Sequence, residues 1–185
     1  LILQNTFHNN MKVLDVGCGE GRNLMYFLQE KFYVCGVDKD PAAIRVIQFL
    51  AGSMRPDLDK DNFQVSDITK LPYSQDSFHL IVASAVLHFA ADNEHFFIMI
   101  SELVRCLKTN GVLYIKMDSN IGVEDLITPD QKGVCQVPDG STRFLLTRDL
   151  LDELQTRYSL VFLKPWKVEI LEGAHSSATL VLTIR

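Results

Sequence analysis

Mostly apolar segments alternate with amphipathic segments along this chain. "KVLDV" (12–16) and "FHLIVASAV" (78–86) are typical of strands that are covered on both faces of a sheet. Between them, "GRNLMYFLQEKF" (21–32) repeats apolar residues at the spacing of one helix face. The pattern predicts strands at 12–16, 33–38, 63–67, 78–86, 111–118, 160–171 and 178–185. It predicts helices at 21–32, 41–54, 93–108 and 147–158.

Local signals sharpen the ends of two of these helices. Asp40 followed by Pro41 is a good N-cap and first position for the second helix. Asp92 is a suitable cap for the third helix, and Gly111 is expected to end it. No internal repeat or low-complexity linker interrupts the series, and the segment 119–146 between the fifth strand and the last helix reads as irregular.

Repeated strand–helix alternation indicates a parallel sheet with right-handed crossovers and helices on both faces. The last two predicted strands are joined by a short polar turn, which favours antiparallel pairing. In such sheets ligands bind beyond the carboxyl ends of the strands. Candidate functional residues are therefore sought at that edge.

The overall composition is that of an ordinary globular protein. The 185 residues are 47% apolar and carry a net charge of −5 without a basic stripe, which makes a nucleic-acid partner unlikely on charge grounds. No apolar run reaches the length of a membrane span and no signal peptide opens the chain. The four cysteines lack CxxC pairing, which favours a reducing, cytoplasmic location. Because the sequence enters a strand almost at once, we expect a preceding N-terminal helix to be missing from it.

Three glycines follow the first predicted strand on alternate positions. Gly17, Gly19 and Gly21 permit positive φ and close approach of a ligand to the backbone, at a helix N-terminus that favours a negative group. A single glycine would suffice for a ligand-free turn. The spacing is G-x-G-x-G, with Arg22 where the dinucleotide fingerprint needs its third glycine, and no G-K-[ST] follows. A nicotinamide dinucleotide site is therefore a poor match, and a P-loop is excluded.

The stretch "VLDVGCGEGRN" (13–23) resembles the first motif of class I S-adenosylmethionine-dependent methyltransferases. "VCGVDKDP" (34–41) is similar to their second motif, in which an acid closes the second strand. "VSDITKLPYSQDSFHLIVASAVLHF" (65–89) and "LKTNGVLYI" (107–115) continue the resemblance, which covers residues 11–118. It implies one α/β domain over 1–185, a Rossmann-like three-layer sandwich. The sheet is expected to be mostly parallel and seven-stranded, with an antiparallel last strand and order 3-2-1-4-5-7-6.

The same resemblance implies the contacts of S-adenosylmethionine and of its product, S-adenosylhomocysteine. Asp15 is similar to the acid that orients the glycine loop and the cofactor's ammonium, and Arg22 to a partner of the methionine carboxylate. Ser84 corresponds to a position that lends a carbonyl oxygen to the methionine amine. The full implied set is Asp15, Gly17, Cys18, Gly19, Gly21, Arg22, Asp38, Lys39, Asp67, Ile68 and Ser84.

Asp38 lies at the distance from the glycine turn where a carboxylate can accept hydrogen bonds from both ribose hydroxyls. By resemblance, Asp67 binds the adenine amino group and Ile68 packs beside the ring. Simpler alternatives stay open: a helix cap or surface acid for Asp38, an Asx turn for Asp67, a solvated charge for Arg22 and a sheet-end serine for Ser84.

The segment after the fourth strand narrows the reaction. It reads "SAVL" (84–87), without the [DNS]-P-P-[YFW] motif of nucleobase and glutamine amine methylators. Ser84 stands where the catechol type has a metal-binding aspartate, so no metal is expected. A cysteine nucleophile of the cytosine type is also disfavoured, because no Pro-Cys dipeptide is present.

Two histidines are weak candidates for a catalytic base. His88 follows the fourth strand near the expected methyl group, and His175 lies in the turn between the last two strands. Either can instead have only a local structural role, and His8, His79 and His95 lack supporting context. The 119–146 loop is expected to cover the pocket and select the substrate, with Asp118, Asp139, Arg143 or Phe144 contributing, unless it is a disordered surface insertion.

These features favour an S-adenosylmethionine-dependent methyltransferase acting on a small molecule. "GCGEGRN" (17–23) is similar to the loop of tellurite-resistance-type methyltransferases, which adds a small oxyanion or thiol-like species as a candidate acceptor. Alternatives are a protein or lipid/quinone-precursor methyltransferase, a non-catalytic cofactor-binding partner subunit, and an NAD-dependent oxidoreductase. The chain is expected to act as a monomer or homodimer.

Overall fold

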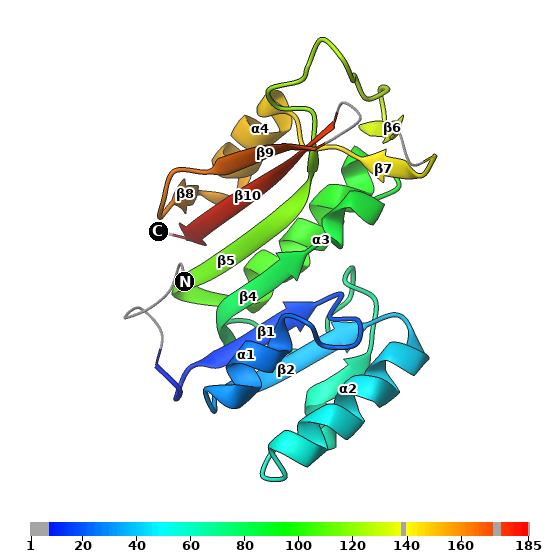
Figure 1. Cartoon of the computed structure of the whole chain (residues 1–185). Helices are drawn as coiled ribbons and strands as arrows, with labels where there is room; N and C mark the ends of the chain where they lie inside the picture. Colours follow the sequence, from blue (N-terminus) through cyan, green and yellow to red (C-terminus); the bar gives the residue numbers. More distant parts are fainter. Residues whose placement is uncertain (1–7, 138–139, 172–174, 185) are drawn as a thin grey trace.

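The structure of this chain is a computed structural model that describes residues 8–137, 140–171 and 175–184. Strands and helices alternate from β1 to β3, β4 follows β3 after a loop rather than a helix, and α3 lies between β4 and β5 (Figure 1). The strands are β1 (Lys12–Val16), β2 (Tyr33–Asp38), β3 (Phe63–Val65), β4 (Phe78–Ser84), β5 (Leu107–Ser119), β6 (Val134–Gln136), β7 (Thr142–Phe144), β8 (Leu160–Phe162), β9 (Lys167–Leu171) and β10 (His175–Ile184). The helices are α1 (Leu24–Gln29), α2 (Pro41–Met54), α3 (Asn93–Cys106) and α4 (Arg148–Tyr158), with short 3₁₀ turns η1 (Lys60–Asn62) and η2 (Leu87–Phe89).

One mixed sheet organises the chain, and within the described residues it has eight strands in the order β3-β2-β1-β4-β5-β10-β8, with β9 also paired to β10. The strands from β3 to β5 are parallel neighbours, whereas β10 runs antiparallel to β5, β8 and β9. The predicted Rossmann-like fold and its order 3-2-1-4-5-7-6 are therefore confirmed. The predicted strand 160–171 divides into β8 and β9, because Pro165 cannot donate to a strand ladder.

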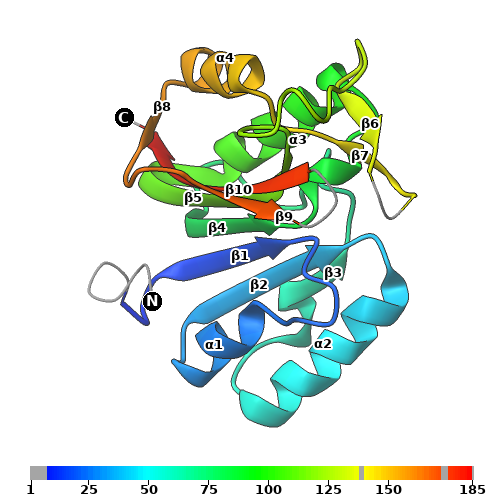
Figure 2. The same ribbon diagram turned by 45° about the horizontal axis from the view of Figure 1, so that its top comes forward.

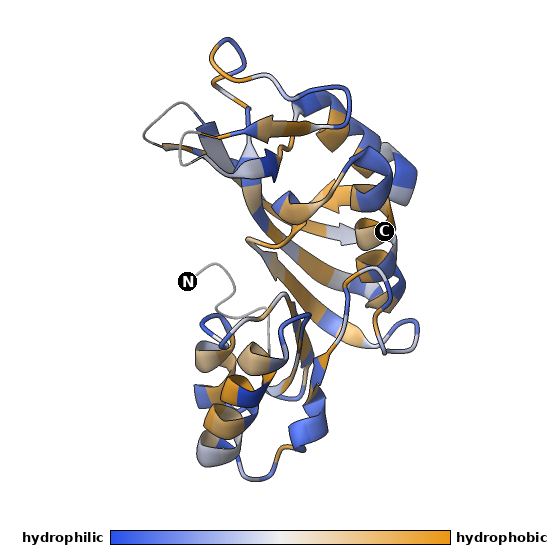
Figure 3. Ribbon diagram, turned by 90° about the vertical axis from the view of Figure 1, so that its right-hand side faces the viewer, coloured by the Kyte–Doolittle hydropathy of each residue, from blue (hydrophilic) through white to orange (hydrophobic). Residues whose placement is uncertain are grey.

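The two faces of the sheet are covered by different helices. Leu14 and Val16 of β1 belong to the core beneath α3 and α4, and Val13 belongs to the core beneath α1 and α2. Figure 2 shows these helix pairs on opposite sides of the sheet, and Figure 3 shows predominantly hydrophobic strands between helices of mixed hydropathy. Among the described residues, no helix is both long and apolar enough to cross a membrane.

Several element ends differ from the prediction, and two of these differences have a clear local cause. The predicted helix 93–108 ends at Cys106, because Leu107 already pairs with Phe78 of β4. The left-handed residue near this junction is Asn110, with φ of 60°, so Gly111 does not end the helix as predicted. The predicted strand 78–86 ends at Ser84, since Ala85 takes a positive φ of 58°.

The described residues of the segment 119–146, which are 119–137 and 140–146, form an ordered insertion, although the sequence pattern reads as irregular. β6 and β7 form an antiparallel pair, and this segment encloses a small apolar core of Val123, Ile127, Val137 and Leu145. The side chain of Asn93 in α3 donates to the backbone oxygen of Gln131 at 3.3 Å, which ties the insertion to the start of that helix. Residues 1–7 and the candidate loop residue Asp139 lie outside the described residues.

Candidate functional site

A cleft of about 180 Å³ lies where the carboxyl ends of β1 to β4 meet. This is the edge at which sheets of this kind bind ligands. It is lined by Gly17, Val37, Asp38, Lys39, Ser66, Asp67, Ile68, Ala85, Val86, Phe89, His95 and Met99. Gly17, Asp38, Lys39, Asp67 and Ile68 are members of the sequence-predicted cofactor set, so the fold brings these five together.

The glycine turn has left-handed backbone at all three glycines, with φ of 65°, 51° and 91° at Gly17, Gly19 and Gly21. A Cβ atom at Gly17 would lie 2.5 Å from Val86, and one at Gly21 would overlap Ile47. A Cβ atom at Gly19 would meet nothing within 4 Å. Packing therefore requires the outer two glycines, whereas the middle one keeps an open space in front of the loop.

Asp38 connects the end of β2 to this loop. One carboxylate oxygen accepts a hydrogen bond from the backbone N–H of Gly19 at 2.8 Å, and the other accepts from the N–H of Asp40 at 2.9 Å. Each carboxylate oxygen retains a further lone pair, so the group can still accept two hydroxyl hydrogen bonds. Asp38 can thus hold the loop and a diol together.

Asp67 lies in the turn after β3, and the predicted Asx turn is present. Its Oδ1 accepts from the backbone N–H and the hydroxyl of Thr69 at 2.8 and 2.7 Å, and these hydrogen bonds lower the pKa of the Asp67 carboxyl. Within the described residues, no hydrogen bond reaches Oδ2. The local turn therefore fixes an ionised acceptor at the cleft beside the apolar side chain of Ile68.

The carboxyl group of Asp15 is buried beneath the glycine turn without hydrogen-bond partners among the described residues. It is 1% exposed, and neither carboxyl oxygen has a hydrogen-bond partner. Burial raises the pKa of Asp15 to about 8, although the side chain of Asn23 offsets part of the effect. A buried carboxyl without partners is costly. It fits a site that receives a positively charged group.

Four polar side chains, here called the polar cluster, gather beside the cleft: His88, Asp118, Arg143 and His175. Asp118 Oδ2 lies 3.2 Å from His88 Nδ1 and 3.7 Å from Arg143 Nε. His175 acts on Asp118 through its charge. Both candidate histidines, His88 and His175, and the predicted loop residue Arg143 therefore surround the carboxylate of Asp118.

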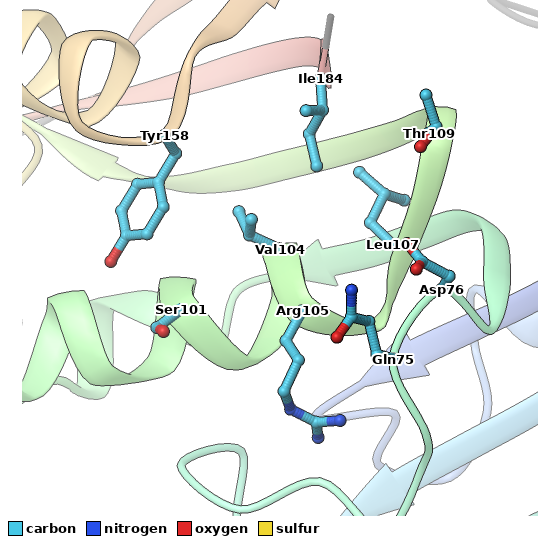
Figure 4. A pocket seen from close by; sticks show the side chains of 9 residues that line it. All are labelled: Gln75, Asp76, Ser101, Val104, Arg105, Leu107, Thr109, Tyr158 and Ile184. Atoms are coloured by element: carbon cyan, nitrogen blue, oxygen red, sulfur yellow. The ribbon is translucent and has the colours of Figure 1, made fainter.

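A larger cavity of about 380 Å³ lies at the opposite edge of the sheet (Figure 4). Its walls come from the ends of α3 and α4, the start of β5 and the end of β10. Within the described residues, its lining contains none of the sequence-predicted cofactor residues, whereas five of them line the smaller cleft. We therefore assign the functional site to the smaller cleft with its acidic side chains.

Comparison with known proteins decides the family. A family model described as a methyltransferase domain matches residues 7–155. The chain belongs to the methyltransferase-domain family. The resemblance of its glycine turn to class I S-adenosylmethionine-dependent methyltransferases is confirmed.

Individual methyltransferases are similar to it at lower identity. Ajmaline N-methyltransferase of Rauvolfia serpentina is 28% identical over 104 residues, which is 56% of this chain but only 34% of that protein. A methyltransferase from Methanosarcina mazei has a TM-score of 0.77 at 21% identity, covering 99% of this chain and 97% of that chain. The 1,6-didemethyltoxoflavin-N1-methyltransferase of Burkholderia thailandensis, solved with S-adenosylhomocysteine, has a TM-score of 0.71 at 17% identity, covering 100% and 76%. The two solved structures show a shared fold.

Six residues of the predicted methyltransferase cofactor set lie outside the cleft lining: Asp15, Cys18, Gly19, Gly21, Arg22 and Ser84. The thiol of Cys18 is buried in the core beneath α1 and α2 and donates to the carbonyl of Gly19 at 3.6 Å. Arg22 is exposed, and Ser84 precedes the residues of the β4 end that face the cleft. Any contact of these six residues with a methyl donor stays a prediction.

Phe144 does not contact substrate as the loop hypothesis allowed. Its side chain is 0% exposed and stacks on Phe96 at 4.9 Å between ring centroids. The expectation fails because β7 turns this face of the insertion towards α3. Phe144 is a core residue.

Sequence reasoning missed several lining residues of the methyltransferase cleft. His95 lies in the first turn of α3, where its Nδ1 accepts the N–H of Ala91 at 3.0 Å. Met99, four residues later, shares its helix face. The predicted cap at Asp92 already placed the start of this helix beside the carboxyl end of β4. From that placement, the positions of His95 and Met99 at the cleft could have been predicted.

Gly19→Ala tests whether the open side of the glycine turn receives the cofactor. We expect a stability loss of about 1 kcal/mol from the left-handed backbone, and a loss of about 1–3 kcal/mol in S-adenosylmethionine binding from the methyl group in the ligand's space. Gly140→Ala is the matched control, since Gly140 also has positive φ and open space. Calorimetric titration of both variants checks this, and equal affinity in the two would contradict it.

The buried Asp15 predicts a pH-dependent stability. The folded chain keeps the Asp15 proton up to about pH 8, whereas the unfolded chain loses it near its ordinary pKa of 3.8. Its contribution is therefore complete below about pH 4 and is lost as pH rises towards 8. Urea unfolding of the natural chain and Asp15→Asn should show a stability difference that falls with pH by at most about 1.4 kcal/mol per unit. A constant difference would refute the assignment.

Proposed function

We propose that this chain is an S-adenosylmethionine-dependent methyltransferase that methylates a small-molecule acceptor. The observation that carries the proposal is the cleft beside the glycine turn, which Gly17, Asp38, Asp67 and Ile68 line together. Asp38 can accept hydrogen bonds from two ribose hydroxyls and Asp67 can accept one from the adenine amine, while Ile68 offers an apolar wall to the adenine ring. Together these groups match the ribose and adenine of a nucleoside.

The chemistry of each residue indicates which part of the cofactor it would hold. Asp38 and Lys39 hold the ribose, while Asp67 and Ile68 hold the adenine. The turn at Gly17 and Gly19 supports the amino-acid end, and a cationic group of the cofactor bound above Asp15 favours the ionised form of that carboxyl. Bound S-adenosylmethionine supplies a sulfonium methyl group for in-line displacement by the acceptor.

Positioning is the main task left to the protein in such a reaction. Holding two reactants in an aligned arrangement is worth up to about 7–11 kcal/mol of the barrier in well-oriented systems. The ordered insertion and η2 flank the cleft: Phe89 of η2 lines it, and Arg143 of β7 lies over the Phe89 ring at 4.8 Å. These elements exclude water and orient the acceptor.

A small-molecule acceptor is supported by charge and by similarity. The net charge of −5 offers no attraction for a polyanion. The curated relative and one structural neighbour are named for methylating ajmaline and 1,6-didemethyltoxoflavin. The alternatives are a protein side chain or a lipid/quinone precursor as acceptor, and a non-catalytic partner subunit. We further propose that the enzyme acts in the cytoplasm as a monomer or homodimer.

Incubation with methyl-labelled S-adenosylmethionine tests this function. Panels of small alkaloid-like and heteroaromatic molecules, thiols, peptides and quinone precursors separate the acceptor classes. We expect label in a small molecule and accumulation of S-adenosylhomocysteine. Label only in peptides or quinone precursors would favour the alternatives. Cofactor binding without transfer to any panel would favour the partner-subunit role.

A further inference from the structure

The polar cluster and the cofactor cleft share a wall. The ring of Phe89 lines the cleft and meets the ring of His88 edge-on, with centroids 4.6 Å apart. The Arg143 guanidinium lies over the same Phe89 ring, 4.8 Å from its centroid. A molecule that reaches the methyl group past Phe89 therefore comes close to His88 and Arg143.

His88 has two different ring nitrogens. The residue is 7% exposed, and Nδ1 is fully buried facing Asp118 at 3.2 Å, with an alignment that falls short of a hydrogen bond. Nε2 has no hydrogen-bond partner among the described residues and is not one of the fully buried atoms. The accessible nitrogen is thus the one that points away from the carboxylate.

Asp118 is an ionised partner for this ring. Burial alone would raise the pKa of Asp118, but contact with His88 and the charges of His88, His175 and Arg143 outweigh burial and lower that pKa. An anion at Nδ1 favours the tautomer with the proton on Nδ1, which leaves Nε2 as a proton acceptor. Arg143 and His175 are the other titratable or charged groups that face this pair within the described residues.

We propose that His88 is the catalytic base and Asp118 its positioning residue, and that the enzyme takes acceptors whose nucleophilic atom carries a dissociable proton. Hydroxyl, phenol, thiol and amine acceptors belong to this class. The inference rests on the proposed methyltransferase function, and it goes further by naming the acceptor class.

The step balances in atoms and electrons. A lone pair of the acceptor atom forms the bond to the methyl carbon, and the pair of the breaking carbon–sulfur bond stays on sulfur, which becomes a neutral thioether. The proton of the acceptor atom moves to His88 Nε2 and later leaves to solvent. Asp118 stabilises the imidazolium while it exists. Within the described residues no group of His, Cys, Asp and Glu is arranged to hold a metal ion.

The test compares His88→Asn and Asp118→Asn with the natural enzyme, using phenol, thiophenol, benzylamine and thioanisole as probes. Thioanisole has no dissociable proton on its nucleophilic sulfur. His79→Asn is the matched control, because His79 lies in β4 and accepts the Lys12 N–H at 3.0 Å, a role that an asparagine oxygen can take over. Affinity for S-adenosylmethionine is measured for every variant by calorimetry.

We expect His88→Asn to lower the rate with the proton-bearing probes by about 10²-fold, without a similar loss on thioanisole and with cofactor affinity retained. Asp118→Asn should lower the rates with the same probes and spare thioanisole, because the imidazolium formed in the step loses the carboxylate that faces it at 3.2 Å. Unchanged rates in both variants, with active natural enzyme, would overturn the assignment.

A second measurement decides the question even if a variant misfolds or no probe is methylated. Nitrogen NMR of histidine-labelled natural protein should show His88 protonated on Nδ1 at neutral pH, with Nε2 free. A proton on Nε2 would refute the base assignment. Failure of the natural protein to bind S-adenosylmethionine would instead refute the proposed function, so the two failures are distinguishable.

Discussion

Phe144→Ala is expected to lower the free energy of unfolding by about 3–5 kcal/mol, which is typical of a large aromatic removed from a core. The ring is fully buried against Phe96, and its edge also lies where a Cβ atom of Gly133 would fall. Its loss leaves a cavity at the junction of the insertion, α3 and the main sheet. Urea or thermal unfolding measures the effect.

Phe49→Ala is the control for this prediction. Phe49 lies on α2 and is 75% exposed, so its loss should change the free energy of unfolding by no more than about 0.5 kcal/mol. If Phe144→Ala were as stable as Phe49→Ala but bound acceptor poorly, Phe144 would be a substrate residue and the core assignment would be wrong.

Asp38→Ala is expected to weaken S-adenosylmethionine binding by about 1–3 kcal/mol, the usual loss for charge-assisted hydrogen bonds. Two causes act together. The ribose loses its acceptor, and the N–H of Gly19 loses the carboxylate that holds it at 2.8 Å. Titration calorimetry with S-adenosylmethionine and with S-adenosylhomocysteine measures the change.

Asp40→Ala is the control that distinguishes a loss of cofactor affinity from a loss of folding stability. The Asp40 side chain caps α2 by accepting the N–H of Ala42 at 2.8 Å. Its loss should cost about 1 kcal/mol of stability and leave cofactor affinity unchanged. Equal affinity of Asp38→Ala and the natural chain would mean that the carboxylate only holds the loop.

The central fold followed from local patterns in the sequence. β1 (Lys12–Val16), β2 (Tyr33–Asp38) and α2 (Pro41–Met54) have the predicted bounds, because buried apolar runs and the Asp40–Pro41 cap are local signals. The β6–β7 pair could not be predicted in this way. Its short strands are held by the insertion's own core and by contacts with α3, which are distant in sequence.

The part of the candidate site that lies at the strand ends could be predicted from the sequence. Asp38, Asp67 and the glycine turn follow directly from strand ends, so resemblance placed them correctly at the cleft. His95 was missed because its neighbourhood depends on how α3 packs beside β3 and β4. The meeting of His88 with Asp118 likewise depends on the pairing of β4 with β5, although each residue had been singled out.

The central claim is that the cleft at the glycine turn binds S-adenosylmethionine, and amide NMR tests it most directly. Adding S-adenosylhomocysteine to the isotope-labelled protein should shift the amide signals of Gly17, Gly19, Lys39 and Asp67, with saturation at one ligand per chain. NAD should leave these signals unchanged. Shifts at the cavity beside Arg105, or a response to NAD alone, would contradict the account.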